Sequence, residues 1–229
     1  MLISRPHSVW KDAYVIGGPE ISHPLDCLVY LVDADDLVLI DAGAGQSYPA
    51  LVDHIRFLGL DPDKLRYAIV THRHIDHIGA LAQFKKHFGV EVIAHEADAE
   101  AIETGRGTGA DVYGVPYEPC SVEHKIKGGE TSLTLGTREF HFVHIPGHTP
   151  GSLAVHMDMA GKRVLFGQDI HGPYLPQWGG DPKAAVVSLE RLLLLDADIL
   201  AEGHFGIFEP ADAVKEYISG YLKQLQSAL

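Results

Sequence analysis

The sequence is short of cysteine, of basic residues and of long apolar runs, and each shortage excludes a class of protein. The 229 residues include two cysteines, Cys27 and Cys120, which is too few for a disulfide framework, so we expect both to be reduced thiols. Lys and Arg number 18 against 31 Asp and Glu, a formal net charge of −13. This charge argues against a nucleic acid partner, because phosphate contacts need clustered basic side chains. No apolar run approaches the roughly 18 residues of a membrane helix, so we expect no membrane partner.

The N-terminal segment, residues 1–8, has neither an apolar h-region nor a small-residue cleavage site, so we expect a cytoplasmic protein. A hydrophobic content of 46% over 229 residues can fill a substantial core. We therefore expect one domain over residues 1–229. The sequence leaves the oligomeric state open.

Histidine, by contrast, is abundant, with 15 copies. Residues 72–77 hold four potential metal ligands, which are His72, His74, Asp76 and His77. They directly follow an apolar, β-like run at residues 67–70, and if that strand continues extended to His74, then His72 and His74 point to the same side. Asp76 and His77 fall where an apolar pattern at helical spacing begins. A His-rich surface loop is the alternative, but the spacing favours a metal site.

Apolar runs separated by polar turns predict strands and helices in both halves of the chain. Residues 28–32 and 37–40 predict a β-hairpin with buried strands. Further strands are predicted over residues 90–94, 132–135, 139–145, 153–157, 163–166 and 199–201, and helices over residues 47–58, 76–89, 96–103, 183–195 and 211–226. Two strand-rich halves that each end in helices suggest two packed sheets with helices outside.

The pattern dissolves between Thr104 and Gly129, where glycines and prolines are frequent. A loop of this length inside a compact domain is usually either a functional lid or disordered. Its aromatic residues, Tyr113 and Tyr117, favour a lid.

Three later strand ends carry a potential ligand beside a glycine. They are His148 in Pro-Gly-His-Thr-Pro-Gly, Asp169 after the strand at residues 163–166, and His204 in Glu-Gly-His. Each alone is weak, because such a residue is more often a cap, but together they extend the cluster that begins at His72. Asp41, which also follows a strand, is either a turn residue or a carboxylate that orients a ligating histidine.

These motifs together resemble the metallo-β-lactamase-fold superfamily of metallohydrolases, particularly its glyoxalase II-like members. The resemblance rests on His72-x-His74-x-Asp76-His77, on the segment around His148, on Asp169, on His204 and on Leu39-Ile-Asp-Ala-Gly43, and it spans about residues 25–210. It implies an α/β (α+β) fold, a four-layer αββα sandwich, with the metal site at one edge of two sheets.

The resemblance also implies a binuclear centre. His72, His74 and His148 would hold one ion, Asp76, His77 and His204 the other, and Asp169 would bridge the two. Imidazole and carboxylate ligands suit zinc, and they also suit iron or manganese. Two such ions make hydroxide available near neutral pH, and Asp76 would act in catalysis by orienting the attacking hydroxide.

The leading hypothesis is hydrolysis of a small-molecule substrate, which would be a small thioester, lactone or related ester. Glyoxalase II itself has a helical glutathione-binding domain after its last ligand, whereas only residues 205–229 follow His204 here, which favours a smaller or different acyl substrate. The alternative is a mononuclear non-haem iron persulfide dioxygenase that uses His72, His148 and Asp169. The sequence leaves open whether His171, Tyr174, Tyr113 and Tyr117 contact the substrate or only pack.

Overall fold

A computed structural model of the chain describes residues 5–229, and residues 1–4 of the predicted domain and N-terminal segment lie outside the described residues. Within residues 5–229, no helix is both long and apolar enough to cross a membrane. Cys27 and Cys120 are both free, as the sequence predicted.

The first sheet contains seven strands whose spatial order follows the chain. They are β1 (His7–Trp10), β2 (Ala13–Gly17), β3 (Val29–Ala34), β4 (Asp36–Ile40), β5 (Leu65–Ile69), β6 (Glu91–His95) and β7 (His124–Ile126). The strands β1 to β4 pair antiparallel, and β4 to β7 pair parallel. The predicted hairpin is confirmed as β3 and β4, whereas β1, β2 and β7 were not predicted.

The second sheet contains six strands. In spatial order they are β13 (Ile207–Phe208), β12 (Ile199–Glu202), β11 (Lys162–Gly167), β10 (Leu153–Met159), β9 (Arg138–His144) and β8 (Glu130–Leu135). Neighbouring strands pair antiparallel except β11 and β12, which pair parallel. The sequence predicted all of these strands except β13.

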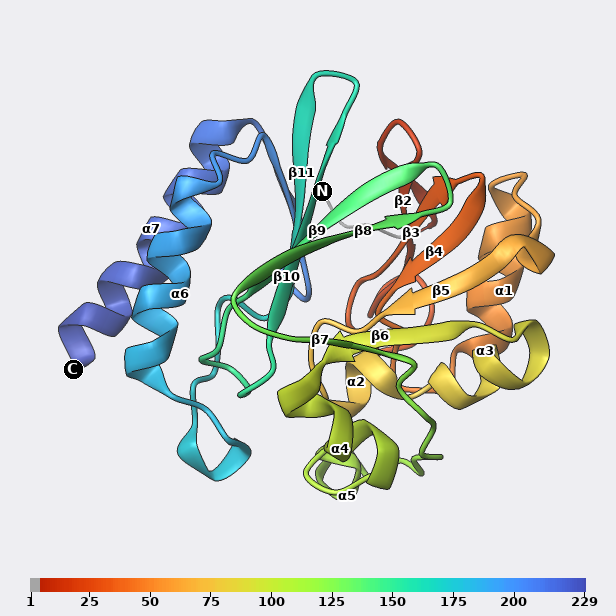
Figure 1. The fold of residues 1–229 in the computed structure, drawn as a ribbon, viewed down its shortest axis with the longest axis horizontal. Helices are drawn as coiled ribbons and strands as arrows, with labels where there is room; N and C mark the ends of the chain where they lie inside the picture. The colour runs from red at the N-terminus through yellow and green to blue at the C-terminus, as the bar shows by residue number, and fades with distance from the viewer. Residues whose placement is uncertain (1–4) are drawn as a thin grey trace.

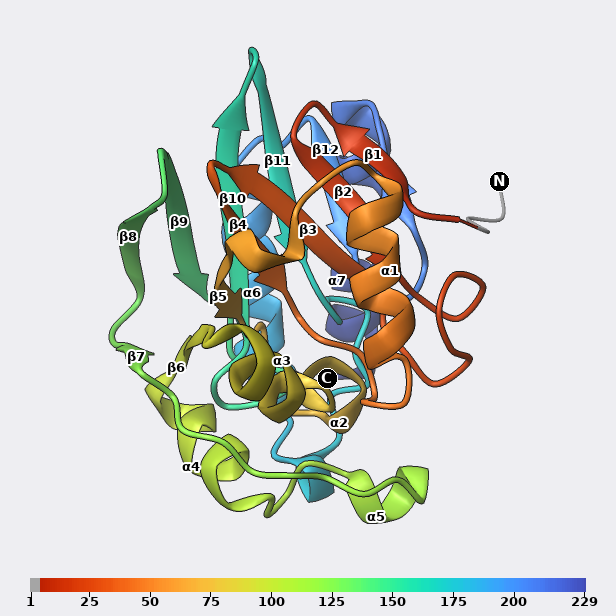
Figure 2. The same cartoon turned by 90° about the vertical axis from the view of Figure 1, so that its right-hand side faces the viewer.

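Helices cover the outer face of each sheet, so the molecule has four layers (Figures 1 and 2). On the first sheet lie α1 (Tyr48–Phe57), α2 (Ile75–Ile78), α3 (Leu81–Phe88) and α4 (Glu96–Thr104), with α5 (Ala110–Tyr113) at one end. On the second lie α6 (Pro182–Leu194) and α7 (Ala211–Ala228), and two 3₁₀ turns are η1 (Pro62–Lys64) and η2 (Pro176–Trp178). The predicted αββα sandwich is therefore confirmed.

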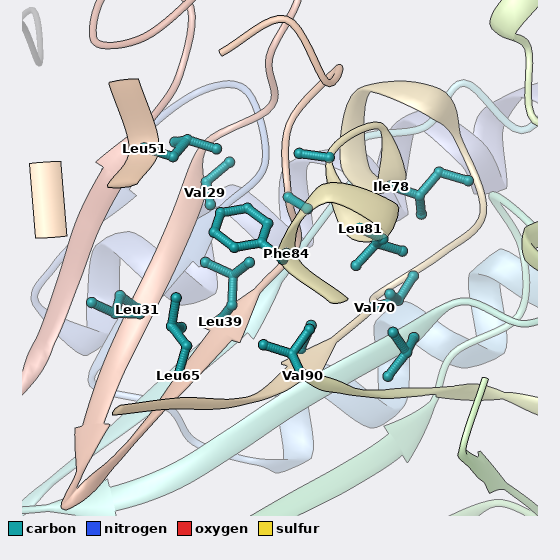
Figure 3. Packing of buried hydrophobic residues seen from close by; sticks show 14 of the residues in the cluster. Val29, Leu31, Leu39, Leu51, Leu65, Val70, Ile78, Leu81, Phe84 and Val90 are labelled. Atoms are coloured by element: carbon teal, nitrogen blue, oxygen red, sulfur yellow. The ribbon is translucent and has the colours of Figure 1, made fainter. Parts of the chain in front are cut away.

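Three buried clusters hold the four layers together. In β3, Val29 and Leu31 face the helices, whereas Tyr30 and Val32 face the second sheet. Because successive side chains point to opposite faces, a strand covered on both sides reads as a continuous apolar run. Figure 3 shows the ring of Phe84 from α3 lying close to Val29 and Leu39 in the helix-side cluster.

One predicted helix is divided in two. We predicted a single helix from Asp76 to about Gly89, and the structure instead has α2 and α3, which are separated at Gly79 and Ala80. The Gly79 N–H donates to the Gly43 carbonyl at 2.7 Å. A Cβ atom at Gly79 would lie 2.2 Å from the carbonyl carbon of Ala44, so this backbone approach requires glycine.

Candidate metal centre

The seven predicted ligands meet at one edge, where strands of both sheets end. His72, His74, Asp76 and His77 follow β5, His148 follows β9, Asp169 follows β11 and His204 follows β12. Two backbone hydrogen bonds beside the ligands cross from one sheet to the other, from Leu153 N to Thr71 O at 2.8 Å and from Leu28 N to Gly203 O at 2.6 Å. Side chains distant in sequence are therefore held beside one another by the backbone.

The sequence analysis aligned His72 and His74 on the condition that the preceding strand continues to His74, and this condition is not met, because β5 ends at Ile69. The backbone N–H of Thr71 donates to Asp41 Oδ1 at 2.8 Å instead of to a neighbouring strand. His72 and His74 nevertheless face the same centre, and their ring centroids lie 4.8 Å apart. Strand alternation is therefore not what aims these two imidazoles.

His72, His74 and His148 form the first group, with one nitrogen from each ring within 4.8 Å of the others. His74 Nδ1 lies 2.8 Å from His148 Nε2. Burial, followed by the charge of His148, lowers the pKa of His74 to about 3, and burial also lowers the pKa of His72 and His148. Unprotonated imidazoles of this kind offer lone pairs to a metal ion near neutral pH.

Asp76, His77 and His204 form the second group, also within 4.8 Å. Asp169 reaches both groups. Its Oδ1 lies 3.4 Å from His77 Nε2 and 3.2 Å from His204 Nε2, and its Oδ2 lies 3.3 Å from His148 Nε2. This is the position in which a carboxylate can bridge two ligand sets.

Several buried polar atoms of the centre lack a hydrogen-bond partner, and a bound cation would provide one. His72 Nε2, His77 Nε2 and Asp169 Oδ1 are buried and have no hydrogen-bond partner, although buried polar atoms are almost always paired. Burial opposes protonation of His204, yet the negative charge of Asp169 and hydrogen bonds to Asp169 and Asp76 outweigh it and raise the pKa of His204 to about 10. Imidazole nitrogens and carboxylate oxygens around one point fit divalent metal ions.

Hydrogen bonds behind the imidazoles fix which nitrogen faces the centre. His77 Nδ1 donates to Asp41 Oδ2 at 2.8 Å, and His148 Nδ1 donates to the Pro173 carbonyl at 2.8 Å. Both rings therefore direct Nε2 toward the other ligands. Asp41 is thus the carboxylate that orients a histidine, which was one of its two predicted roles.

The backbone is strained at both carboxylates that organise the centre. Asp41 and Asp169 adopt left-handed conformations, with φ of 59° and 52° respectively. A residue other than glycine occupies this region only where its surroundings impose it. At Gly203 a Cβ atom would lie 2.5 Å from Asp169 Oδ1, so a side chain there would displace the carboxylate.

A cavity of about 630 Å³ opens above the ligands and includes His74, Asp76, His148, Asp169 and His204 in its lining. Part of the predicted lid, residues 107–113 with α5, contributes to the wall. Tyr113 lines the cavity, whereas the Tyr117 hydroxyl donates to the Ile102 carbonyl at 2.9 Å and lies outside the lining. The Tyr174 hydroxyl donates to the Ile170 carbonyl, which is a packing role.

His171 also lines the cavity, and a buried carboxylate holds its ring. Its Nδ1 donates to Glu202 Oε1 at 2.7 Å, and Glu202 is fully buried. The other Glu202 oxygen accepts the backbone N–H groups of His204 and Phe205 at 2.6 and 2.9 Å. Glu202 therefore couples His171 to the loop that carries His204.

Asp98 is a residue of the site that the sequence analysis missed. It is 1% exposed in α4, and its carboxylate accepts from Arg73 N, Thr149 Oγ1 and Gly151 N at 3.1, 2.6 and 3.1 Å. It thereby joins the segment of His72 and His74 to the segment of His148. The predicted helix was acidic throughout, so only the spacing of Asp98 beside the apolar Ala99 and Ile102 could have marked it as buried.

Comparison with known proteins agrees with this geometry. The family model described as the Metallo-beta-lactamase superfamily matches residues 23–204. Hydroxyacylglutathione hydrolase GloC of Haemophilus influenzae is 29% identical over 80% of this chain and 85% of its own. Acyl-coenzyme A thioesterase MBLAC2 of Gallus gallus is 30% identical over 82% of this chain and 75% of its own.

Among solved structures, the subclass B3 metallo-beta-lactamase BJP-1 of Bradyrhizobium japonicum superposes with a TM-score of 0.79 at 21% identity. The match covers 97% of this chain and 91% of that one. At this identity the likeness concerns the fold alone.

Proposed function

The chain is a hydrolase of the metallo-beta-lactamase superfamily, and from this premise we propose that it cleaves small thioesters or related esters with two divalent metal ions. The observation that carries the proposal is the convergence of seven ligand-type side chains around buried, unpartnered atoms of His72, His77 and Asp169. The names of both curated relatives describe thioester cleavage, which supports a thioester as the first substrate class to test.

We assign the ligands as two sets that share one carboxylate. His72, His74 and His148 would hold one ion, and Asp76, His77 and His204 the other, with Asp169 between them. The mixture of neutral imidazoles and carboxylates favours zinc, and iron and manganese accept the same donors.

When bound, two such ions lower the pKa of water and polarise a carbonyl oxygen. The side chains of the protein orient the reacting groups. Asp76, at the cavity floor, orients the attacking water, whose oxygen bonds to the acyl carbon while the C–S or C–O bond breaks. The departing thiolate or alkoxide takes up a proton, so that one acid and one thiol or alcohol leave.

We assign substrate contacts to two residues of the cavity lining, Tyr113 and His171. Burial, together with the negative charge of Asp76, raises the pKa of Tyr113, so its hydroxyl remains a hydrogen-bond donor at neutral pH. We assign it to the acyl oxygen or to the leaving group. The His171 ring, held by Glu202 through Nδ1, presents its other nitrogen to the cavity.

The test is metal stoichiometry of the purified protein combined with hydrolysis of a panel of small thioesters and lactones. We expect two zinc ions per chain and metal-dependent release of thiol. One iron per chain together with sulfite formation from a persulfide would overturn the proposal in favour of the dioxygenase, which would use His72, His148 and Asp169. Thiol release that persists after removal of metal by a chelator would also contradict it.

A further inference from the structure

Apart from the candidate ligands, the described wall of the cavity offers no unpaired Lys or Arg side chain to a substrate. Among residues 5–229, Arg73 is the one Lys or Arg in its lining, and the Arg73 side chain is 17% exposed. Its Nη2 donates to the Trp178 carbonyl at 3.0 Å, and its Nη1 lies 3.7 Å from Asp98 Oδ1. The guanidinium is therefore already neutralised by a buried carboxylate and fixed in place.

Charges near the cavity mouth also disfavour an anionic substrate. Asp111 lines the mouth and is exposed. Arg106 precedes the lining residue Gly107 but lies outside the lining, and its Nη2 pairs with Glu100 at 2.7 Å. The chain carries a formal net charge of −13, so its overall field repels anions.

The same wall is apolar where it meets solvent. Val112 on α5 and Phe205 after β12 line the cavity, yet they are 63% and 59% exposed. Trp178 and Pro173 continue the surface on the side of His74 and His148. Exposed apolar side chains gathered around a cavity are typical of a site that a ligand covers.

We propose that the substrate is a neutral thioester or ester with an apolar chain lying against Val112, Trp178 and Phe205. It is not a thioester of glutathione or coenzyme A, whose carboxylates or phosphates would find no unpaired Lys or Arg side chain in this wall. This inference rests on the proposed hydrolase function and specifies the substrate class of the same site.

The test compares one hexanoyl group on three thiols: N-acetylcysteamine, which is neutral, glutathione and coenzyme A. With the metal-loaded protein, we expect kcat/KM to be highest for the neutral thioester by about tenfold, because electrostatic repulsion slows association of the two anionic thioesters by at least this order. A kcat/KM for either anionic thioester that equals or exceeds the neutral value overturns the inference and leaves the hydrolase proposal intact. Failure to hydrolyse any of them overturns both.

Binding without chemistry provides a second measurement. The S-hexyl thioethers of N-acetylcysteamine and glutathione cannot be hydrolysed, and Trp178 lies in the cavity lining, so its fluorescence reports their binding. We expect tighter binding of the neutral thioether, and tighter binding of S-hexylglutathione contradicts the inference.

A positive charge introduced at the cavity mouth tests whether the substrate lies against Val112. Val112→Arg adds a cation at the mouth, and Val187→Arg adds the same charge on α6 at a valine that is 57% exposed and outside the lining. We expect Val112→Arg to raise kcat/KM for the glutathione thioester relative to the neutral one several-fold, and Val187→Arg to leave this ratio unchanged. An equal shift in both variants, or no shift in Val112→Arg, refutes the assigned substrate path.

Discussion

Replacing Asp98 with alanine removes a buried carboxylate that ties two ligand-bearing segments together. The variant would leave the N–H groups of Arg73 and Gly151 without their acceptor. It would also leave the partly buried Arg73 guanidinium without its carboxylate partner. Leaving one buried donor unsatisfied costs about 1–3 kcal/mol, and breaking a buried ion pair costs about 3–5 kcal/mol. These effects overlap, so we expect the free energy of unfolding to fall by about 3–5 kcal/mol in total.

Replacing Asp98 with asparagine removes the negative charge but keeps a hydrogen-bond acceptor, so this variant separates the two contributions of the carboxylate. Burial raises the pKa of Asp98, although hydrogen bonds from Thr149 and Arg73 oppose the shift. Burying the ionised carboxylate therefore lowers the stability of the folded protein. Asp98→Asn keeps one acceptor oxygen and removes that cost, and we expect it to lose about 1–2 kcal/mol, the value of the hydrogen bonds given up.

Urea unfolding of both variants, with metal content measured on the folded proteins, checks this reasoning. Asp53→Ala is the matched control, because the Asp53 side chain is 73% exposed and pairs with Arg56 on the same helix. We expect that control to change stability by less than about 0.5 kcal/mol. Suppose that the free energy of unfolding of Asp98→Ala lies within about 1 kcal/mol of the value for the unmodified protein, and that the variant binds metal normally. Asp98 then does not hold the segment of His72 and His74 against the segment of His148.

Three further predictions concern the centre, the cavity and the second sheet. Asp169→Ala should lose bound metal, measured by elemental analysis, and turnover together; full activity with two metals retained would refute the bridging assignment. Tyr113→Phe should lower kcat about tenfold with unchanged metal content, and an unchanged kcat would place Tyr113 outside the reaction. Burial, then Arg163 and His141, lower the pKa of His156 to about 4 from a model-peptide value of 6.5, so folding stability should fall as pH drops through that window. The free energy of unfolding of His156→Gln, measured with urea, should depend less on pH between pH 7 and 4 than that of the unmodified protein. An equal pH dependence would show that His156 is not the group responsible.

The sequence predicts the layers well where a residue pattern is compatible with a single kind of element. The apolar run at residues 28–32 is continuous because β3 is covered on both faces, with Val29 facing helices and Tyr30 facing the second sheet. The ligand residues could be predicted because they lie in motifs that follow strands and that resemble those of a known family. Their roles as ligands remain a prediction. Strands such as β1 and β13 are short and lack that apolar run.

The contacts behind the ligands could not be predicted, because they join segments far apart in the chain. Asp98 meets Thr149 across 51 positions and His171 meets Glu202 across 31. The end of β5 depends on Asp41, which captures the Thr71 N–H, and the break after α2 depends on the approach of Ala44 to Gly79. Each of these features follows from tertiary packing, which overrides the local pattern.

A segment that carries no ligand holds three ligand-bearing segments in place. Just before β3, Cys27 N donates to the Asp76 carbonyl at 3.3 Å and Leu28 N to the Gly203 carbonyl at 2.6 Å. The Leu28 carbonyl accepts from Gln168 Nε2 at 3.1 Å, next to Asp169. Because backbone contacts fix the ligand set, changes in substrate between relatives need not disturb it. They can fall on α5 and on η2, which shape the cavity wall without supplying a ligand, and these are the elements that carry Val112 and Trp178.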